Sequence, residues 1–225
     1  MNLIKMDGFF HPSQAKGAAH IIGCGAVGSS IAFILAHCGV TNFVLYDDDT
    51  VESHNIANQM FREKDIGRPK VEALRDILVE INPEIADEIR IVNGKYVDQP
   101  LSGYVFLCVD SVAVRKAIAQ SQQYNPEILT LSDVRLGLTD SRDYVVGWRD
   151  PNEIRRFLKT MNFTDEDAKA LTPHTACNVM LSVCTSVFAI CSLAVSNWMR
   201  FIRTEGKDKK STVLLDVDTM MLSAF

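Results

Sequence analysis

The glycine run at residues 23–28 constrains the fold more than any other feature of the sequence. It reads Gly-Cys-Gly-Ala-Val-Gly, a G-x-G-x-x-G pattern, and it directly follows the apolar stretch 17–22. A helical pattern of apolar residues continues over 28–38, and a second apolar stretch, 42–46, ends in Asp47. This order predicts a buried strand, a glycine turn, a helix and a second parallel strand, which together form a βαβ unit.

The glycine run and Asp47 together predict a nucleotide site. Glycines between a strand and a helix let backbone N–H groups approach a phosphate at the positive end of the helix. An acidic residue at the end of the second strand is the usual partner of a ribose hydroxyl. The same residues fit NAD, FAD, S-adenosylmethionine and ATP, and a tight turn that packs helix on strand without any ligand is the plainer alternative. These residues alone therefore leave the ligand open.

The chain after this unit continues as alternating helix and strand patterns. Helical spacing over 70–80 and 112–123 alternates with apolar stretches at 89–92, 104–109 and 128–131. We expect this half of the chain to form the parallel, nucleotide-binding part of a Rossmann-like sheet.

The remaining residues predict a different arrangement. Residues 136–148 are typical of an antiparallel extension, because Val145 and Val146 follow a polar turn at 139–142. The other expected elements are a helix over 152–161 within a crossover loop of about 150–177, a long apolar helix of about 178–203, and a last strand at 212–217.

The expected fold class is therefore α/β, in a single domain over residues 1–225. Its Rossmann-like sheet would be parallel in the nucleotide-binding half, 1–135, and antiparallel in the strands of the C-terminal half, 136–225. Helices would cover both faces of the sheet.

The composition argues against several other classes of protein. A net charge of −5 without a basic run argues against nucleic-acid binding, and residues 1–10 lack the apolar core of a signal peptide, which makes the cytoplasm the expected location. Residues 179–202 are long enough to span a membrane, yet Ser, Thr and Asn side chains interrupt them, so we expect a core or dimer-interface helix and no membrane contact. The six cysteines form no CxxC pair, and we therefore expect reduced thiols and no zinc site.

The motifs around and after Asp47 narrow the choice of ligand. They are D-x-D-T-V at 47–51, N-x-x-x-Q at 55–59, D-I-G-x-P-K at 65–70, I-N-P at 81–83, and Val109-Asp110 with Arg115 five residues on. With the glycine run, this combination resembles the ubiquitin-activating enzymes and their bacterial relatives ThiF and MoeB, over about residues 18–137. The resemblance implies an enzyme that uses ATP to adenylate the C-terminal glycine of a ubiquitin-like or sulfur-carrier protein.

The resemblance also implies nucleotide-binding roles for a defined set of residues. The glycines would form the turn around the phosphates, Asp47 would bind the ribose, and Asn55 would contact the triphosphate. The full set is Gly23, Gly25, Ala26, Gly28, Asp47, Asn55, Asn58, Lys70, Asp110 and Ser111.

Two residues of the set would carry the chemistry of adenylation, in which a carboxylate attacks the α-phosphate and pyrophosphate leaves. By resemblance, Lys70 would stabilise the developing negative charge and Asp110 would hold Mg²⁺ through ATP, with Arg115 beside it. Each has a plainer interpretation. Asp47 and Asp110 both fit helix N-caps. Lys70 fits a solvated surface lysine, and Arg115 fits an ion pair within its own helix.

One position departs from the family pattern. The family usually has an arginine for the γ-phosphate where this chain has Asn58, and no arginine occurs before Arg62 to enter a partner subunit's site. The loss of such a charge-assisted contact costs about 1.5–3 kcal/mol. Either the backbone is shifted so that Arg62 or Arg68 contacts the γ-phosphate in place of the family arginine, or adenylation is weak or absent.

Many relatives transfer the adenylated carrier to a cysteine on the crossover loop, and Cys177 stands at about that place. The expected helix from about 178 would lower the pKa of the Cys177 thiol and favour the thiolate. The alternative is structural, because Cys177, Cys184 and Cys191 recur every seven residues as in a buried stripe. Cys184 and Cys191 are expected in the core, and His174 in a loop.

The sequence as a whole predicts a homodimeric, ATP- and Mg²⁺-dependent adenylyltransferase. Its partner would be a small ubiquitin-like or sulfur-carrier protein of the β-grasp type, joined through its C-terminal Gly, and thioester or persulfide transfer could follow. A catalytically inactive scaffold that binds nucleotide or a partner is the first alternative, motivated by Asn58. An NAD-dependent Rossmann oxidoreductase is the second, disfavoured by the motif at 65–70.

Overall fold

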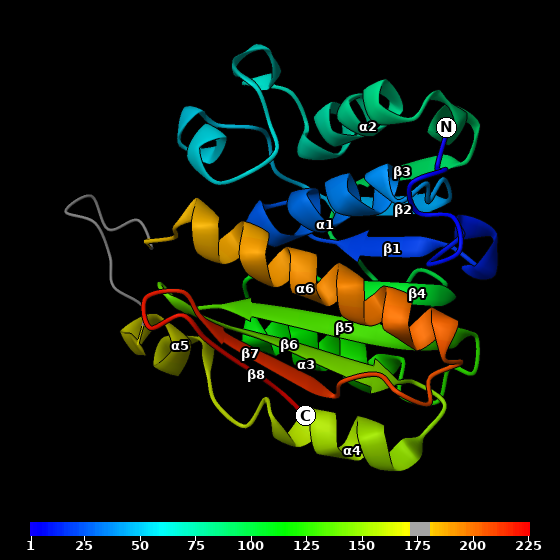
Figure 1. Ribbon diagram of the computed structural model, residues 1–225. Helices are drawn as coiled ribbons and strands as arrows, with labels where there is room; N and C mark the ends of the chain where they lie inside the picture. Colours follow the sequence, from blue (N-terminus) through cyan, green and yellow to red (C-terminus); the bar gives the residue numbers. More distant parts are fainter. Residues whose placement is uncertain (172–180) are drawn as a thin grey trace.

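The structure of the protein, a computed structural model, describes residues 1–171 and 181–225 (Figure 1). Its strands form one mixed sheet with the order β3-β2-β1-β4-β5-β6-β7-β8. The strands β1 to β5 are parallel to one another, whereas β6, β7 and β8 are added by antiparallel pairing. The bounds are β1 Ala19–Ile22, β2 Phe43–Asp47, β3 Ile89–Asn93, β4 Gly103–Leu107, β5 Ile128–Leu136, β6 Asp140–Gly147, β7 Thr212–Asp216 and β8 Met221–Ala224.

Helices cover both faces of this sheet. Ile31, Leu74 and Ile190 pack α1, α2 and α6 on one face, and Ile118 and Phe157 pack α3 and α4 on the other. Figure 1 shows this layering, with α6 in front of the sheet and α3 behind it. The bounds are α1 Ala26–His37, α2 Lys70–Ile81, α3 Val112–Ser121, α4 Pro151–Lys159, α5 Asp165–Leu171 and α6 Cys184–Arg203, with short 3-10 helices η1 Pro12–Gln14, η2 Ser53–Ala57, η3 Glu63–Asp65 and η4 Pro83–Asp87.

Strand β1 lies at the centre of the parallel half because its residues are buried on both faces. Ile21 packs toward α1, α2 and α6, and Ile22 packs toward the opposite face. Its neighbours pair in register, so that Ile22 lies opposite Tyr46 of β2 and Leu107 of β4. The carboxyl ends of these strands meet at one edge, where Rossmann-like folds bind their ligands. The predicted α/β class, the parallel N-terminal half and the antiparallel C-terminal strands are confirmed.

The crossover region contains a helix that the sequence analysis did not predict. Residues 162–171 were interpreted as loop, but α5 forms there. Thr164 starts the helix as half of a capping box, in which Asp167 N–H donates to Thr164 Oγ1 and Thr164 N–H donates to the Asp167 carboxylate. The T-x-x-D spacing was a readable signal for this start.

Two further boundaries in the C-terminal half were wrong. The long helix α6 begins at Cys184, after extended backbone at Val183, and not near residue 178. Strand β6 begins at Asp140, inside the turn that was predicted at 139–142, because its backbone pairs with both β5 and β7. The strand β7 is also not the last one. Residues 221–224 add β8 to the edge of the sheet, where backbone pairing outweighs their weak strand propensity.

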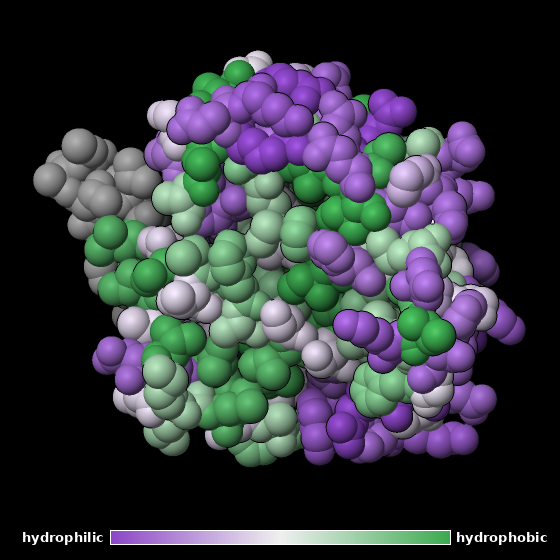
Figure 2. Space-filling view, turned by 45° about the horizontal axis from the view of Figure 1, so that its top comes forward, coloured by the Kyte–Doolittle hydropathy of each residue, from purple (hydrophilic) through white to green (hydrophobic). Residues whose placement is uncertain are grey.

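Within residues 1–171 and 181–225, α6 is the helix long and apolar enough to cross a membrane. Its Val187, Ala194 and Trp198 are buried against the sheet, so in this fold it is a core helix. Its outer face is also partly apolar, since Phe188 is 39% exposed. Figure 2 shows hydrophobic residues gathered over the middle and lower left of the face that carries α6.

Candidate nucleotide-binding site

The glycine turn joins β1 to α1, and its three glycines serve different purposes. Gly23 has a φ of +93°, and a Cβ there would come within 2.9 Å of the Cys108 carbonyl group. A Cβ at Gly28 would lie 1.8 Å from the Gly23 carbonyl oxygen. By contrast, a Cβ at Gly25 would meet nothing within 4 Å. Packing therefore explains Gly23 and Gly28, whereas Gly25 leaves the backbone accessible to a ligand.

The start of α1, which includes Ala26, is suited to an anion. Gly25 is the N-cap and provides no side-chain hydrogen bond, and the first turn contains no acidic residue. The first N–H groups of a helix lack intrahelical partners and lie at the positive end of its dipole. A phosphate at this point would satisfy them.

Asp47 lies at the end of β2 and spans the gap to the glycine turn. Its carboxylate accepts hydrogen bonds from the backbone N–H of Cys24 at 2.5 Å and of Asp49 at 2.9 Å. Burial raises the pKa of Asp47, and these hydrogen bonds oppose that effect. Asp47 therefore does not cap a helix, and the N-cap interpretation is wrong for this residue. Each carboxylate oxygen keeps a further lone pair for a ribose hydroxyl.

Lys70 is the first residue of α2, and its side chain is buried beside Asp47. Its Nζ donates to Asp49 Oδ2 at 2.8 Å, and its backbone N–H donates to the Asp49 carbonyl at 2.9 Å. The interpretation of Lys70 as a solvated surface lysine is therefore wrong. The Asp49 side chain is 66% exposed and that of Lys70 is 8% exposed, so the ion pair lies just beneath the surface.

The segment between these residues positions two asparagines. Asn55 is buried, and its Oδ1 accepts from the Glu52 N–H at 2.9 Å, which fixes η2. Its Nδ2 has no hydrogen-bond partner among the described residues and is the atom left for a phosphate. Asn58 ends η2 and is half-buried, with its N–H directed to the Asn55 carbonyl at 3.3 Å.

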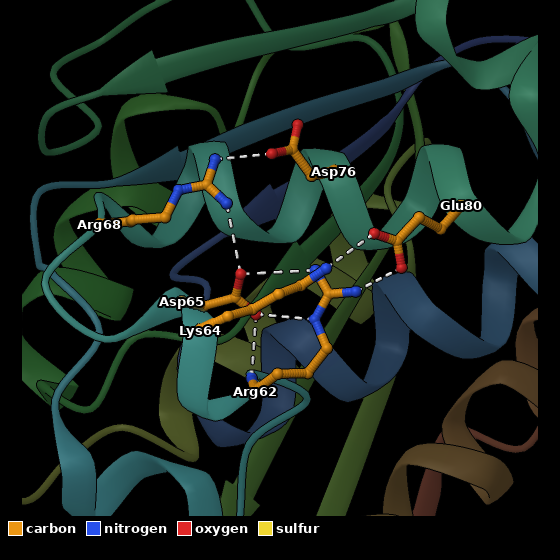
Figure 3. Close-up of polar contacts among 6 residues, drawn as sticks. All are labelled: Arg62, Lys64, Asp65, Arg68, Asp76 and Glu80. Atoms are coloured by element: carbon orange, nitrogen blue, oxygen red, sulfur yellow. Dashed lines mark hydrogen bonds and ion pairs between the residues drawn. The ribbon is translucent and has the colours of Figure 1, made fainter.

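Arg62 and Arg68 are both held by acidic residues of a network around Asp65 (Figure 3). Asp65 is fully buried and receives Arg62 Nε at 2.9 Å and Arg68 Nη1 at 3.3 Å. Arg62 also pairs with Glu80, and Arg68 Nη2 donates to Asp76 at 2.6 Å. These contacts lower the pKa of Asp65 despite the opposing effect of its burial. The structure thus gives both arginines acidic partners in the Asp65 network.

Asp110 follows β4, two residues after Cys108, whose carbonyl group lies against Gly23. The side chain of Asp110 is exposed and forms no hydrogen bond or ion pair with any described residue. Ser111 is the N-cap of α3, because its Oγ accepts from the Val114 N–H at 3.1 Å. The N-cap interpretation is therefore wrong for Asp110 as well, and its carboxylate has no partner in the part of the chain that the structure describes.

Arg115 is buried behind this loop and not within the open site. Its Nη1 donates to the Leu107 carbonyl at 3.1 Å and pairs with Asp133 of β5, which is fully buried. Arg135 binds the other oxygen of Asp133. The plainer interpretation, an ion pair within the helix, is wrong, because this ion pair joins α3 to β5. Arg115 therefore supports the end of β4, from which the Asp110 loop departs.

The acidic residues of the site suit a magnesium ion bound to a nucleotide. Mg²⁺ prefers oxygen ligands and is held in such sites by one or two carboxylates together with phosphate oxygens and water. Asp110 offers an exposed carboxylate that has no partner within residues 1–171 and 181–225. The carboxylates of Asp47, Asp48 and Asp49 lie within 4.8 Å of one another, but Asp49 already binds Lys70. The donor chemistry of these carboxylates therefore fits Mg²⁺.

The cysteines in the described part of the chain are buried, except for Cys184. Cys177 lies outside the described residues. The long helix that was expected to begin at about residue 178 begins at Cys184. Cys191 is fully buried, and its burial raises the pKa of the thiol, which confirms its place in the core. Cys184 is only half-buried, contrary to the prediction.

Sequence reasoning missed two residues of this region. Asp49 belongs to the acidic run after β2, but its pairing with Lys70 depends on the fold. Asp165 binds the first turn of α3 from the crossover region, accepting from Ser111 Oγ at 2.8 Å. The capping box before α5 was the only local signal for its position.

Several known enzymes resemble this chain over about half of its length. Ubiquitin-like modifier-activating enzyme 5 of Caenorhabditis elegans is 32% identical over 114 residues, which are 44% of this chain and 27% of the enzyme. Molybdopterin-synthase adenylyltransferase of Escherichia coli K12 is 39% identical over 105 residues, 44% of this chain and 41% of the enzyme. The sulfur carrier protein ThiS adenylyltransferase of the same strain is 36% identical over 123 residues, 52% and 49% of the two chains. The chain thus matches less than half the length of each relative.

Solved structures share the fold over nearly the whole chain. E. coli MccB, in a crystal structure with ATP, matches with a TM-score of 0.67 at 16% identity, covering 95% of this chain and 64% of MccB. PaaA matches with a TM-score of 0.69 at 14% identity, covering 94% of this chain and 64% of PaaA.

The sequence model of the ThiF family matches residues 14–224, nearly the whole length of the chain. This range contains the glycine turn, Asp47 at the end of β2, and Asp110. The chain belongs to the ThiF family.

Proposed function

We propose that residues 1–225 act as one adenylation domain, which uses ATP and Mg²⁺ to adenylate the C-terminal carboxylate of a small ubiquitin-like or sulfur-carrier protein. The observation that carries this proposal is the free Asp110 carboxylate at the same sheet edge as the glycine turn. Two of the relatives act, by their names, on a ubiquitin-like modifier and on ThiS. These names support the class of substrate.

In the proposed reaction, an oxygen of the substrate carboxylate attacks the α-phosphorus of ATP. The bond from that phosphorus to the oxygen bridging to the β-phosphate breaks, and pyrophosphate leaves. Bound Mg²⁺ would supply charge neutralisation on the phosphates. The products are the acyl-adenylate of the carrier and pyrophosphate.

The residues of the site would divide the binding of ATP among them. The N–H groups at Gly25 and Ala26 would receive a phosphate at the start of α1, and Asp47 would accept from the ribose hydroxyls. Lys70 would exchange its Asp49 partner for a phosphate oxygen as charge develops on the leaving group. Asp110 would hold the magnesium. The pairing with Asp49 supports this role because it holds the ammonium group in place before ATP binds.

A scaffold that binds nucleotide without turnover is the second candidate. It is favoured by Asn58 together with the engagement of Arg62 and Arg68 in the Asp65 network, because the γ-phosphate then lacks a dedicated cation. Transfer of the carrier to a thiol would be a later step. Cys177 remains the proposed acceptor on its sequence position alone.

The exchange of radiolabelled pyrophosphate into ATP separates these candidates. The assay would compare wild type with Asp110→Ala and with Asp218→Ala, which removes another exposed aspartate, on the turn between β7 and β8. Carrier-dependent exchange that is lost only in Asp110→Ala supports the enzyme. ATP binding without exchange, across a panel of carriers with C-terminal glycines, supports the scaffold. Binding of NADH without binding of ATP would contradict both.

We further propose that the protein is a homodimer that buries the exposed face of α6. This face carries Phe188, and Val183 at its start is 40% exposed. The edge strand β8 adds Met221 and Leu222, which are 63% and 56% exposed. An apolar patch that a fold leaves exposed marks an interaction site. Figure 2 shows hydrophobic residues gathered on this side of the molecule.

A further inference from the structure

A pocket of about 430 Å³ lies over β1, β2 and β3, apart from the residues assigned to ATP. Alternation along β2 determines which side chains face it. Phe43 and Leu45 pack with α1 and α2, and so Val44 and Tyr46 face the opposite side, where they line the pocket. Gln99, in the segment between β3 and β4, closes one wall. No helix contributes a lining residue.

The floor of the pocket is a hydrogen-bonded pair, His20 and Tyr46, each at most 3% exposed. The backbone N–H of Ser102 donates to His20 Nε2 at 3.4 Å, which makes this nitrogen an acceptor. Burial, and then the charge of Arg90, lower the pKa of His20 to about 4, so the imidazole is neutral near pH 7. A neutral imidazole that accepts at Nε2 carries its proton on Nδ1.

This tautomer leaves the hydroxyl proton of Tyr46 without an acceptor. His20 Nδ1–H donates to Tyr46 Oη at 3.1 Å, so the hydroxyl proton of Tyr46 must be directed elsewhere. No described residue accepts it. A buried donor without a partner is destabilising, and a ligand in the pocket would satisfy it.

Two further donors lie at the wall and the rim. Gln99 uses its Oε1 to accept from the Val97 N–H at 2.7 Å, which leaves its amide N–H groups without a partner among the described residues. The Arg90 guanidinium is exposed and likewise has no hydrogen bond or ion pair in the described part of the chain. No Asp or Glu belongs to the lining, whereas Val44, Val92 and Pro100 supply apolar walls.

We propose that this pocket binds a small organic carboxylate with an apolar body. Arg90 would pair with the carboxylate, while the Tyr46 hydroxyl and the Gln99 amide would donate to its oxygens. Charge-assisted, planar contacts of this kind are what a guanidinium provides to a carboxylate. The apolar walls would enclose the rest of the ligand, and the volume lies in the range of small-molecule sites. The proposal is independent of the adenylation activity.

The probe is 2-naphthoate, followed by ¹⁵N–¹H NMR spectra of the whole protein. Its neutral counterpart 2-naphthamide and inorganic phosphate serve as comparison ligands. The expected result is saturable shifts of amide signals from residues 90–92, 99, 101 and 102 with naphthoate, and much smaller shifts with the amide. Asp110→Ala should bind naphthoate as wild type does, because Asp110 belongs to the nucleotide site.

Variants then test the assigned donors. Arg90→Gln should weaken naphthoate binding by roughly 10-fold or more, and Tyr46→Phe by roughly 2- to 10-fold. Arg142→Gln, which removes an exposed arginine on β6, should leave binding unchanged. Since Arg90 is exposed, its replacement tests the proposal even if Tyr46→Phe disturbs the core. The absence of saturable shifts at 90–102, equal binding of the amide, binding of phosphate but not naphthoate, or unchanged affinity in Arg90→Gln would each overturn the proposal.

Discussion

The carboxylate of Asp165 accepts a hydrogen bond from Ser111 Oγ at 2.8 Å, one residue beyond Asp110. Its other oxygen accepts from the backbone N–H of Val112 at 2.5 Å. This contact ties α5 of the crossover region to the first turn of α3. The loop that carries the proposed magnesium ligand is thus fixed from both sides, by Asp165 at the surface and by Arg115 in the core.

Replacement of Asp165 by Ala should destabilise the protein by about 1–2 kcal/mol, the usual cost of losing such contacts at a helix start. The hydrogen bond from Ser111 and then those from the backbone lower the pKa of Asp165, so this contribution is present near neutral pH and is lost as the pH falls through the lowered value. Urea unfolding at pH 7 measures the effect. Asp165→Asn retains an acceptor oxygen and should lose less stability than Asp165→Ala. Equal losses of stability in the two variants would contradict the proposed role of the Asp165 hydrogen bonds.

Replacement of Asn58 by Arg should restore the family's contact to the γ-phosphate. The expected effect is tighter ATP binding, by roughly 10- to 100-fold for a charge-assisted hydrogen bond. Titration of ATP with Mg²⁺ into each variant, by calorimetry, measures it. Asn58→Gln is the neutral control of similar reach. If Arg and Gln give the same affinity as wild type, position 58 does not face the triphosphate.

The buried Asp143 should make stability depend on pH. Burial raises its pKa to about 7, while Ser132 Oγ donates to it at 2.6 Å. The folded state therefore holds this proton over a range in which the unfolded state has released it. The free energy of unfolding should consequently fall as the pH rises from about 4 to about 7 and then level off.

Asp143→Asn removes this titrating group. The free energy of unfolding of the variant should therefore not show the decrease between about pH 4 and about pH 7, which is of the order of a few kcal/mol in the wild type. Urea unfolding of both proteins at a series of pH values gives the difference. Parallel curves for the variant and the wild type would show that Asp143 does not titrate in this range.

The proposed dimer predicts a specific sensitivity of α6. Phe188→Glu places a charge on the exposed apolar face and should convert a dimer into a monomer, as measured by light scattering after gel filtration. Tyr124→Glu is the control. Tyr124 follows the C-terminal end of α3, is 89% exposed and does not belong to the apolar face of α6. A dimer that survives Phe188→Glu would place the interface elsewhere, and a monomeric wild type would contradict the dimer itself.

Local sequence signals predicted the parallel half of the fold well. The glycine run, the helix over 70–80 and the apolar stretch at 104–109 each carry a period or a turn that neighbouring residues alone determine. They located α1, α2 and β4 within a few residues. The end of β2 at Asp47 also followed from this pattern, and with it the edge of the sheet at which the candidate site lies.

The features that were missed depend on contacts between distant segments. The pairing of Arg115 with Asp133 joins α3 to β5, and nothing near Arg115 in the sequence indicates it. Similarly, β8 exists because β7 offers an open edge, and the burial of Lys70 follows from the chain returning to Asp49. The start of α6 at Cys184 was also missed, because the apolar pattern of the sequence continues before that residue. Propensity and periodicity do not encode such long-range contacts.

The central claim is that Asp110 supports adenylation of a carrier's C-terminal carboxylate, and the most direct measurement is the acyl-adenylate itself. The protein would be incubated with ATP, Mg²⁺ and each of a panel of ubiquitin-like and sulfur-carrier proteins, and the intact carrier would then be analysed by mass spectrometry. We expect one carrier to gain the mass of AMP at its C-terminal glycine with wild type and with Asp218→Ala, and not with Asp110→Ala. Formation of the adduct by Asp110→Ala at the wild-type rate, or no adduct on any carrier although ATP binds, would contradict the claim.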